Sequence, residues 1–476
     1  MHAGDRVALW LPNVPAWLVA FFACARLGAI AVAVNTRFRS SELADILQRS
    51  GARVLLFWPG FRGIDFAGVL AACEPASLAQ LETLVAYEET GGGPRPVLAG
   101  KKTVPYGTLA AAAPLATDDG SPEAGCALFT TSGTTKAPKF VLHDQRTVLA
   151  HAADVVHGFD MREDAVLLLI PPLCGVFGFC SAMAALAAGR PMVMAPAWDP
   201  AQAARDIVAH RVTHINGTDE AAAQLLAVPG ATFPHVKLFG YASFNPSQTE
   251  VVGRADARGL RLVGLYGASE LQALLARQDE RAAPEDRMLG GGRLVSPLAS
   301  VRARDPESGQ LLPHGAQGEL EFLAPASRMV EYFGNEEATR SAFTADGYYR
   351  SGDLGYTQED GRFVYLARLG DALRLGGFLV SPAEIEAVVQ EVPGIGACQV
   401  VGARAPAGLV PVAFVLLQQD AVLDERAVLA HVAARLARYK VPQRVFPVDA
   451  FPVTPGANAT KIQKGKLREM AEALLH

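Results

Sequence analysis

Short apolar runs alternate with helix-like stretches through the first part of the chain. The runs are RVALWL (6–11), AIAVAV (29–34), RVLLFW (53–58), AVLLLI (165–170), PMVMAP (191–196), THINGT (213–218), KLFGYA (237–242) and RLVGLYG (261–267). Alanine-rich segments such as 199–210 and 219–227 separate many of them. Strands that alternate with helices predict an α/β fold with largely parallel sheets that are covered on both faces. Such sheets bind ligands in the loops after their strands.

The pattern changes near residue 290 and again near residue 370. From 290 to 324 the chain has short strands with turn residues every few positions, which indicates antiparallel structure or a small β-barrel. After residue 370 we expect a helix, two strands and a second helix. The signals are Ser381 at the N-cap with Pro382 and Glu384 after it, strands over 397–403 and 410–417, and a helix over 424–438. This last part predicts a small α+β module.

The most apolar stretch, residues 14–34, is long enough to suggest a membrane span. Pro15 and Gly28 interrupt it and Arg26 lies within it, so we interpret it as a buried helix followed by a buried strand. The N-terminal segment carries Asp5 where a signal peptide would need positive charge. We therefore expect a cytoplasmic protein without a membrane span.

Composition narrows the function further. Half of the residues are apolar, 19% are charged and the net charge is -5, which is typical of a compact protein and gives no electrostatic reason to expect nucleic acid. The six cysteines form no C-x-x-C pair, which indicates reduced thiols. The segment HRVTH (210–214) lacks the glutamate of a zinc-binding H-E-x-x-H motif, and we interpret His143 as a structural residue.

The segment TTSGTTKAPKF, residues 130–140, is the first candidate for chemistry. It combines five hydroxyl side chains, one glycine and two lysines directly after an apolar run. Hydroxyl groups, backbone amides and ammonium groups are the donors that surround phosphate oxygens. The segment does not match the P-loop pattern, and a G-x-G-x-x-G fingerprint does not occur in the chain. Taken alone, it could equally be an exposed Ser/Thr linker.

Four further segments accompany it in order: GLYGASE (264–270), GYYRSGDLGY (347–356), ARLGDALRLGGFLVSPAEIE (367–386) and NATKIQKGKLRE (458–469). Together, from about Gly4 to the C-terminus, they resemble the acyl-adenylate-forming superfamily of acyl- and aryl-CoA synthetases, luciferases and peptide-synthetase adenylation domains. The resemblance implies a large N-terminal domain over 1–369, with two mostly parallel α/β sheets and a small β-barrel-like part. A small, mobile α+β domain over 370–476 would close over ATP and a carboxylic acid.

The resemblance also assigns nucleotide-binding roles. The phosphates would be held by Thr130, Thr131, Ser132, Gly133, Thr134, Thr135 and Lys139. The adenine site would include Gly240, Tyr241, Tyr266 and Gly267, and Ser269 would reach the α-phosphate. Glu270 would hold Mg²⁺, because a carboxylate beside phosphates makes sense chiefly as a metal ligand. Asp353 and Arg368 would contact the ribose. Singly, these residues could also be a helix-start glutamate, a turn aspartate and a surface arginine.

The C-terminal residues receive catalytic and hinge roles. Lys461, rather than Lys464 or Lys466, matches the lysine that stabilises the charge developing on the transferring phosphoryl group. The alternative is a basic, solvated helix face. Gly370 lies at the hinge. Gly376 and Gly377 would leave room for the pantetheine arm of CoA. The sequence departs from the family pattern at Lys136, Phe140, Ala367, Gly370 and Thr460.

The acid would bind beside PPLCGVFGFC, residues 171–180. This segment has no acidic residue to hold an α-amine, which argues against an amino acid substrate. The expected pocket residues are Cys174, Gly175, Phe177, Gly240 and Gly267, while Trp198 could line the pocket or belong to the core. We expect an AMP-forming ligase that joins a fatty, aromatic or alicyclic acid to CoA with ATP and Mg²⁺. Alternatives are carrier-protein loading and a non-catalytic nucleotide-binding homologue; whether the protein forms a homodimer stays open.

Overall fold

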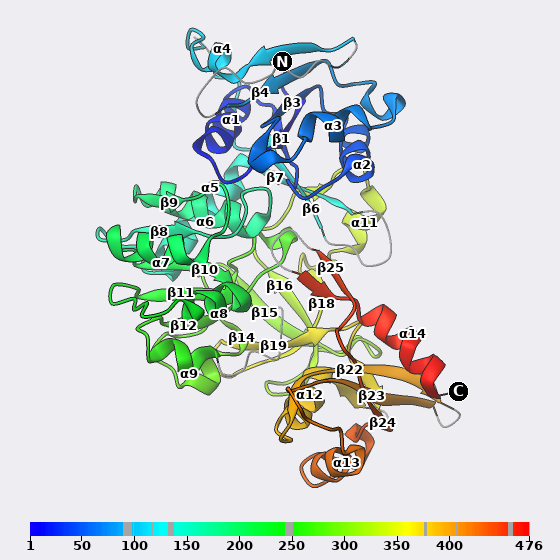
Figure 1. Ribbon diagram of the computed structural model, residues 1–476. Helices are drawn as coiled ribbons and strands as arrows, with labels where there is room; N and C mark the ends of the chain where they lie inside the picture. Colours follow the sequence, from blue (N-terminus) through cyan, green and yellow to red (C-terminus); the bar gives the residue numbers. More distant parts are fainter. Residues whose placement is uncertain are drawn as a thin grey trace.

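The structure is a computed structural model. It describes residues 1–88, 98, 100–115, 118–131, 138–242, 251–375, 378–405, 408–455 and 460–475. Figure 1 shows the N-terminal sheet at the top, a second sheet in the middle and the C-terminal residues at the lower right. The predicted α/β fold class, with a large N-terminal part and a small C-terminal part, is confirmed.

The first sheet has eight strands in the order β17-β7-β6-β2-β1-β3-β4-β5. Its strands are β1 (Arg6–Trp10), β2 (Ile30–Ala33), β3 (Val54–Phe57), β4 (Thr83–Ala86), β5 (Lys102–Pro105), β6 (Gly125–Thr130), β7 (Phe140–Asp144) and β17 (Glu331–Tyr332). Its helices are α1 (Pro15–Arg26), α2 (Ser40–Ser50), α3 (Phe66–Ala71) and α4 (Tyr106–Ala110). The run from β6 to β5 is parallel, whereas β7 and β17 are antiparallel additions. The apolar stretch 14–34 thus forms a helix and a strand of this sheet, as predicted.

The second sheet has eleven strands in the order β15-β16-β18-β19-β14-β13-β12-β11-β10-β8-β9. The strands are β8 (Leu167–Leu169), β9 (Met192–Met194), β10 (His214–Thr218), β11 (Leu238–Ala242), β12 (Leu262–Tyr266), β13 (Ala276–Arg277), β14 (Gly290–Leu294), β15 (Ser300–Arg304), β16 (Gly318–Leu323), β18 (Tyr349–Thr357) and β19 (Phe363–Arg368). Its parallel part runs from β12 to β9. The antiparallel strands that the sequence predicts after residue 290 continue this sheet through β13 and β14.

Helices cover the second sheet and join it to the first. They are α5 (Gln145–Gly158), α6 (Val176–Ala187), α7 (Pro200–Ala209), α8 (Asp219–Ala227), α9 (Val251–Asp256), α10 (Pro284–Arg287) and α11 (Glu336–Ser341). Helix α6 is apolar on all sides and buried along most of its length, as expected of a helix between two layers. Phe179 of α6 packs edge-on against Phe21 of α1, with ring centroids 4.9 Å apart. The two sheets therefore share one hydrophobic core through these helices.

The C-terminal residues build a core of their own. They form β20 (Leu373–Leu375), β21 (Phe378–Val380), α12 (Pro382–Gln390), β22 (Ile395–Ala405), β23 (Gly408–Leu417), α13 (Glu425–Ala433), β24 (Arg444–Pro447), β25 (Val453–Pro455), β26 (Thr460–Ile462) and α14 (Lys464–Leu475). Ile385, Val400 and Val428 belong to this core. Ser381 occupies the predicted N-cap of α12, but its hydroxyl donates to the carbonyl of Leu366, 3.3 Å away, instead of capping the helix.

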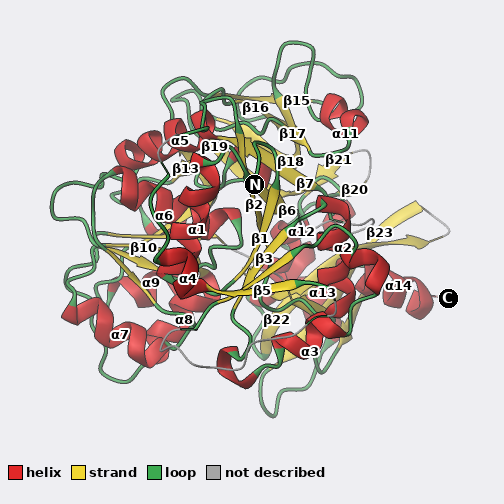
Figure 2. Cartoon of the chain, turned by 90° about the horizontal axis from the view of Figure 1, so that it is seen from above, coloured by secondary structure: helices red, strands yellow, loops and turns green. Residues whose placement is uncertain are grey.

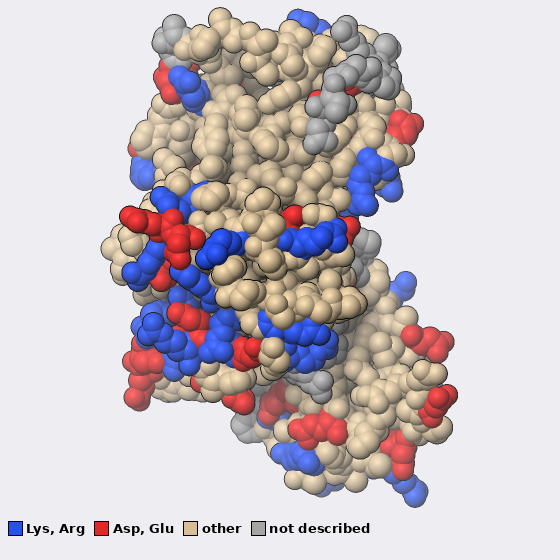
Figure 3. All heavy atoms as spheres, turned by 60° about the vertical axis from the view of Figure 1, so that its left-hand side comes forward, with Lys and Arg blue, Asp and Glu red and all other residues tan. Residues whose placement is uncertain are grey.

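The charged side chains on the surface are of both signs (Figure 3). On the face shown in Figure 3, basic and acidic side chains lie close to one another over the lower half, unlike the single-sign stripe of a nucleic-acid-binding surface. In the described part of the chain, none of the helices combines the length and the apolar character that a bilayer crossing needs. All six cysteines are free and buried. Figure 2, seen from above, shows helices on both sides of the central strands.

Candidate active site

Three strands of the second sheet bring together an aspartate, a tyrosine and an arginine. Asp353 lies in β18, Tyr266 ends β12 and Arg368 ends β19. The Tyr266 hydroxyl donates to Oδ2 of Asp353 over 2.6 Å, and Nη1 of Arg368 lies 3.0 Å from Oδ1. The Arg368 guanidinium also donates to the carbonyl of Ser351 over 2.9 Å. The residues predicted to meet the adenine and the ribose are therefore neighbours, although 87 positions separate Tyr266 from Asp353.

Asp353 is a buried acid whose Oδ1 can accept further hydrogen bonds. Only 3% of the residue is exposed, and Oδ1 makes no hydrogen bond of good geometry despite its proximity to Arg368. Burial raises the pKa of Asp353 to about 6, against the lowering effects of Arg368 and Tyr266. At neutral pH the side chain is thus an anionic acceptor that still needs donors, as a pair of ribose hydroxyls would supply.

A second acid, Glu270, lies directly after β12. It is 9% exposed, and its Oε1 accepts a hydrogen bond from the Tyr332 hydroxyl over 2.7 Å. Nζ of Lys139 lies 4.2 Å from the centroid of the Tyr332 ring, within the range of a cation–π contact. The negative charge of Glu270 contributes to the raised pKa of Asp353, so the two acids act on each other electrostatically. Glu270 therefore links the β12 loop to the base of the phosphate segment.

The loop after Tyr266 is unusually tight. Gln272, Ala273 and Leu274 all have positive φ, at 58°, 47° and 34°, which is rare for residues other than glycine. A Cβ on Gly267 would lie 2.6 Å from the backbone carbonyl carbon of Ala273, so only glycine fits. Loops in sparsely populated conformations are often found at ligand sites. This conformation turns Ser269 and Glu270 back toward β7 and β17.

A buried histidine of β7 supports this loop from behind, and a second buried histidine, His151, lies in α5. Nε2 of His143 in β7 lies 2.9 Å from the carbonyl oxygen of Ser269 and donates to it. Burial lowers the pKa of His143 to about 4, and burial lowers that of His151 to about 4 as well. Both rings are therefore neutral at physiological pH. The structural role predicted for His143 agrees with this position, since it holds the backbone of a predicted site residue.

The phosphate segment is described only at its two ends. Thr130 pairs with Phe140 at the end of β6, and the amide of Thr131 donates to the carbonyl of Lys139 over 3.0 Å. The amide of Lys139 in turn donates to Oγ1 of Thr131 over 3.3 Å. These bonds join the described residues on either side of 132–137, at the ends of β6 and β7. Ser132, Gly133, Thr134 and Thr135 lie outside the described residues.

Three of the residues predicted to line the acid pocket lie at the start of α6. Gly175 is the N-cap of this helix, and Cys174 and Phe177 beside it are 6% and 7% exposed. Asn13 holds the preceding loop, because its amide donates to the carbonyl of Pro171 and accepts from the backbone of Leu173. Burial raises the pKa of the Cys174 thiol to about 12, so it lines the pocket as a small neutral group.

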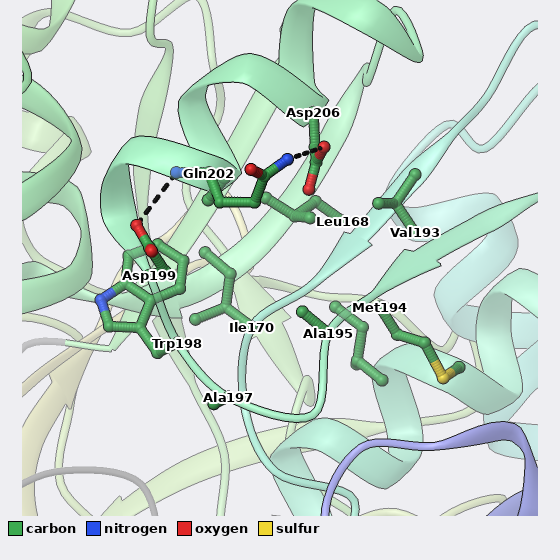
Figure 4. A pocket seen from close by; sticks show the side chains of 12 residues that line it. Leu168, Ile170, Val193, Met194, Ala195, Ala197, Trp198, Asp199, Gln202 and Asp206 are labelled. Carbon is green, nitrogen blue, oxygen red and sulfur yellow. Dashed lines mark hydrogen bonds between the residues drawn. The ribbon is translucent and has the colours of Figure 1, made fainter. Parts of the chain in front are cut away.

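Gly240 and Tyr241, adjacent in β11, face opposite sides of the sheet. Tyr241 packs in the cluster with Phe239, and its hydroxyl donates to the carbonyl of Met288 over 3.1 Å. Its side chain is thus engaged away from Gly240, and a nucleotide could meet Tyr241 only through its backbone. Gly240 faces Leu265 and Asn216 instead. Trp198 lines a separate hollow at the β8–β9 edge, shown in Figure 4, and its indole donates to Gln224 over 2.5 Å.

The C-terminal part carries Lys461 in a two-stranded hairpin. The backbone of Lys461, in β26, pairs with that of Thr454 in β25. Lys464, by contrast, holds its ammonium 3.2 Å from Oε1 of the buried Glu386, which ties α14 to α12. Lys464 thus has a structural partner, and the catalytic role of Lys461 stays a prediction. Gly376 and Gly377 lie outside the described residues.

Sequence reasoning missed two residues that the structure brings to this region: Tyr332 beside Glu270 and Asn216 beside Gly240. Tyr332 comes from a two-residue strand that joins the first sheet far from the other motifs in sequence. Its only sequence signal is an aromatic residue in EYFGN, which has no distinctive spacing. Residues of this kind are found from the folded structure, because their partners are set by the pairing of distant strands.

Comparisons with known proteins agree with this geometry. Residues 1–332 match the model of the AMP-binding enzyme family, and residues 384–457 match that of the AMP-binding enzyme C-terminal domain. A CoA ligase of Mycobacterium tuberculosis, named for a methyl-dioxo-octahydroindenyl propanoyl group, is 30% identical and covers 99% of this chain and 90% of its own. Feruloyl-CoA synthase of an Amycolatopsis species is 30% identical, with coverage of 98% and 89%. The crystal structure of ATP-bound MatB from Rhodopseudomonas palustris superposes with a TM-score of 0.84 at 25% identity, covering 100% of this chain and 90% of that one. The chain therefore belongs to the AMP-binding enzyme family.

Proposed function

We propose that this member of the family is an AMP-forming ligase that joins a carboxylic acid to CoA in two half-reactions. The observation that carries the proposal is the cluster of the buried Tyr266 and Asp353 with the partly exposed Arg368, and the Glu270 loop beside it. A cluster of this kind suits a nucleoside, because the anionic Asp353 can accept hydrogen bonds from ribose hydroxyls beside the Tyr266 side chain. The Glu270 loop next to it contacts Tyr332, which lies against Lys139 at the end of the phosphate segment. The CoA ligases among its relatives support the same activity.

In the first half-reaction, a carboxylate oxygen attacks the α-phosphorus of ATP. The bond from that phosphorus to the bridging oxygen breaks, and pyrophosphate leaves with the electron pair. Negative charge accumulates on the phosphoryl group as it transfers, and the ammonium of Lys461 is proposed to stabilise it. Ser269 would contact the same phosphate, because its loop is held near β7 by His143.

Asp353 and Glu270 would have different tasks in this step. Asp353 would accept hydrogen bonds from the ribose hydroxyls through Oδ1, which has no donor of its own in the described structure. Glu270, with one oxygen engaged by Tyr332, fits a Mg²⁺ ion that takes one protein carboxylate and otherwise phosphate oxygens and water. That ion would neutralise phosphate charge when bound.

In the second half-reaction, the CoA sulfur attacks the acyl carbon and the bond to AMP breaks. We propose that residues 370–476 rotate as a domain between the two steps, with Gly370 at the hinge, and that Gly376 and Gly377 make room for the pantetheine arm. A Cβ at Gly370 would meet no atom within 4 Å, although Nη2 of Arg468 in α14 donates to the Gly370 carbonyl over 3.4 Å. The separate hydrophobic core of the C-terminal residues supports movement as a unit.

The acid itself would lie between the start of α6 and β11. Cys174, Phe177 and Gly240 offer an apolar surface without an acidic side chain, which favours an acid with a largely apolar body. Fatty, aromatic and alicyclic acids meet this description. An α-amino acid does not, because its ammonium would be buried without a partner.

The test is acid-dependent release of pyrophosphate from ATP and Mg²⁺ across a panel of these acids. We expect release with at least one acid, followed by thioester formation when CoA is added. Replacing CoA with a phosphopantetheinylated carrier protein distinguishes carrier loading, which would support transfer only to the carrier. Tight ATP binding without pyrophosphate release for every acid would overturn the proposed function and indicate a non-catalytic homologue.

A further inference from the structure

Asn216 places a polar group inside the apolar region proposed to hold the acid. It lies in the middle of β10, is 5% exposed, and pairs across the sheet with Gly240 of β11. Paired residues of parallel strands point to the same face of a sheet. The amide of Asn216 therefore leans over the position where Gly240 lacks a side chain. A Cβ at Gly240 would lie 2.6 Å from Oδ1 of Asn216 and 3.0 Å from the methyl groups of Leu265.

Helix α6 determines which end of this amide faces Gly240. The Ser181 hydroxyl donates its single hydrogen to the carbonyl of Phe177, over 2.8 Å. It must then accept from Asn216, whose Nδ2 donates to it over 3.1 Å. This sequence of bonds turns Oδ1 away from α6 and toward Gly240. The hydrogen-bond network alone determines which end of the amide is the oxygen.

Oδ1 of Asn216 is buried and accepts no hydrogen bond in the described structure. Leaving a buried amide oxygen without a donor is costly, so such atoms call for an explanation. Leu265, the other side chain beside Gly240, is apolar and cannot donate. Oδ1 and the Leu265 methyl groups fill the space over Gly240, so a bound molecule can supply the missing donor only if the Leu265 side chain moves aside.

We propose that Asn216 selects carboxylic acids that carry a hydrogen-bond donor, such as a hydroxyl group, on their otherwise apolar body. Oδ1 can only accept, so the complementary group is a donor; an ether, a ketone or a methyl group in that place would leave the oxygen unsatisfied. Ser181 positions the amide, and a shift of the Leu265 side chain would open Oδ1 to the acid. This inference rests on the proposed ligase function and names its substrate class.

The test compares matched pairs of acids that differ only in hydroxyl against methyl. Suitable pairs are para-hydroxycinnamate with para-methylcinnamate, omega-hydroxydodecanoate with tridecanoate, and hydroxy- with methylcyclohexanecarboxylate. The readout is kcat/KM for pyrophosphate release. For at least one pair we expect the hydroxylated acid to be preferred about tenfold or more. Asn216→Leu, which keeps a similar shape, should lower that preference about tenfold through the hydroxylated acid alone, with KM for ATP unchanged.

Gln224→Leu is the matched control, since it removes an amide that bonds Trp198 in the separate hollow, and it should leave the preference as it is. Should Asn216→Leu fail to fold, Ser181→Ala frees the amide to turn and should also reduce the preference. Two results would overturn the inference and leave the proposed ligase function standing: equal use of both members of every pair by the wild-type enzyme, or a preference that Asn216→Leu does not change. Equal use is the result expected if a water molecule is bound permanently to Oδ1. Absence of pyrophosphate with all acids would instead remove the proposed function itself.

Discussion

Among single residues, Asp353 shows how burial can make nucleotide binding depend on pH. In its proposed role the charged form accepts hydrogen bonds from the ribose hydroxyls, and burial raises the pKa of Asp353 to about 6. The charged form is therefore lost as the pH falls through that value, and ATP affinity should fall with it. His143 does not contribute to such a profile above about pH 5, since its pKa is lowered to about 4.

We predict that KM for ATP rises about tenfold between about pH 7 and about pH 5, following the charged fraction of Asp353. Initial rates at saturating acid measure it. Asp353→Asn keeps the shape but not the charge, so its KM should be high and should vary much less over the same range. Because the phosphates of ATP titrate equally with both enzymes, the difference between the two profiles isolates Asp353. Parallel profiles would contradict the assignment.

Tyr332 is a second residue-scale case. Tyr332→Phe removes the hydrogen bond to Glu270 but keeps the ring beneath Lys139. We expect KM for the Mg²⁺–ATP complex to rise about fivefold, in line with one lost hydrogen bond worth about 1 kcal/mol. Tyr348→Phe is the control, since the Tyr348 hydroxyl contacts only Ser300 within the described contacts, and its KM should not change. If both variants behave alike, Tyr332 does not position Glu270.

What the sequence predicts at this scale depends on whether a residue belongs to a recognisable motif. Tyr266, Glu270 and Asp353 each lie in a distinctive segment, and the structure brings the three segments together. Tyr332 and Asn216 lie in ordinary apolar context, and only their partners reveal their roles. Those partners, Glu270 and Gly240, are 62 and 24 positions away. Pairing of that kind follows from the fold and leaves no local pattern.

At the scale of single elements, the loop after β12 is the most constrained. Gly267→Ala would place a methyl group against the backbone of Ala273, with no flexible side chain to give way. We predict a loss of about 1–3 kcal/mol in the free energy of unfolding, measured by thermal or urea denaturation. Gly370→Ala is a matched control, because its added methyl would meet nothing within 4 Å. Equal stability of both variants would show that the loop adjusts.

Helices and strands were predictable where their periodicity was local. The helix at 199–210 and the one at 219–227 match α7 and α8 to within a residue at each end. The antiparallel part after residue 290 was less predictable. Its strands join the parallel ones through β13 and β14, and β14 pairs with β19, a strand far from it in sequence. The Ser381 side chain was also hard to predict. Its hydroxyl donates to Leu366, a residue of β19, instead of capping α12.

At the scale of the whole molecule, the N-terminal and C-terminal parts have separate hydrophobic clusters, and the chain around Gly370 joins them. The largest cluster joins both sheets through α1 and α6, and two others belong to the C-terminal strands and helices. The nucleotide cluster lies in the larger part, and Lys461 in the smaller. The family and the fold class were predictable because five motifs occur in a fixed order. We propose that the two parts change their relative placement between the half-reactions, and sequence patterns do not encode such a motion.

The central claim is that Lys461 serves the adenylation step alone. The most direct measurement takes Lys461→Ala and follows both half-reactions: pyrophosphate release from ATP and acid, and consumption of supplied acyl-adenylate by CoA. We predict a loss of about 100-fold or more in the first and little change in the second, while Lys466→Ala, an exposed lysine nearby, keeps both. An equal loss in both half-reactions, or full adenylation without Lys461, would contradict this account.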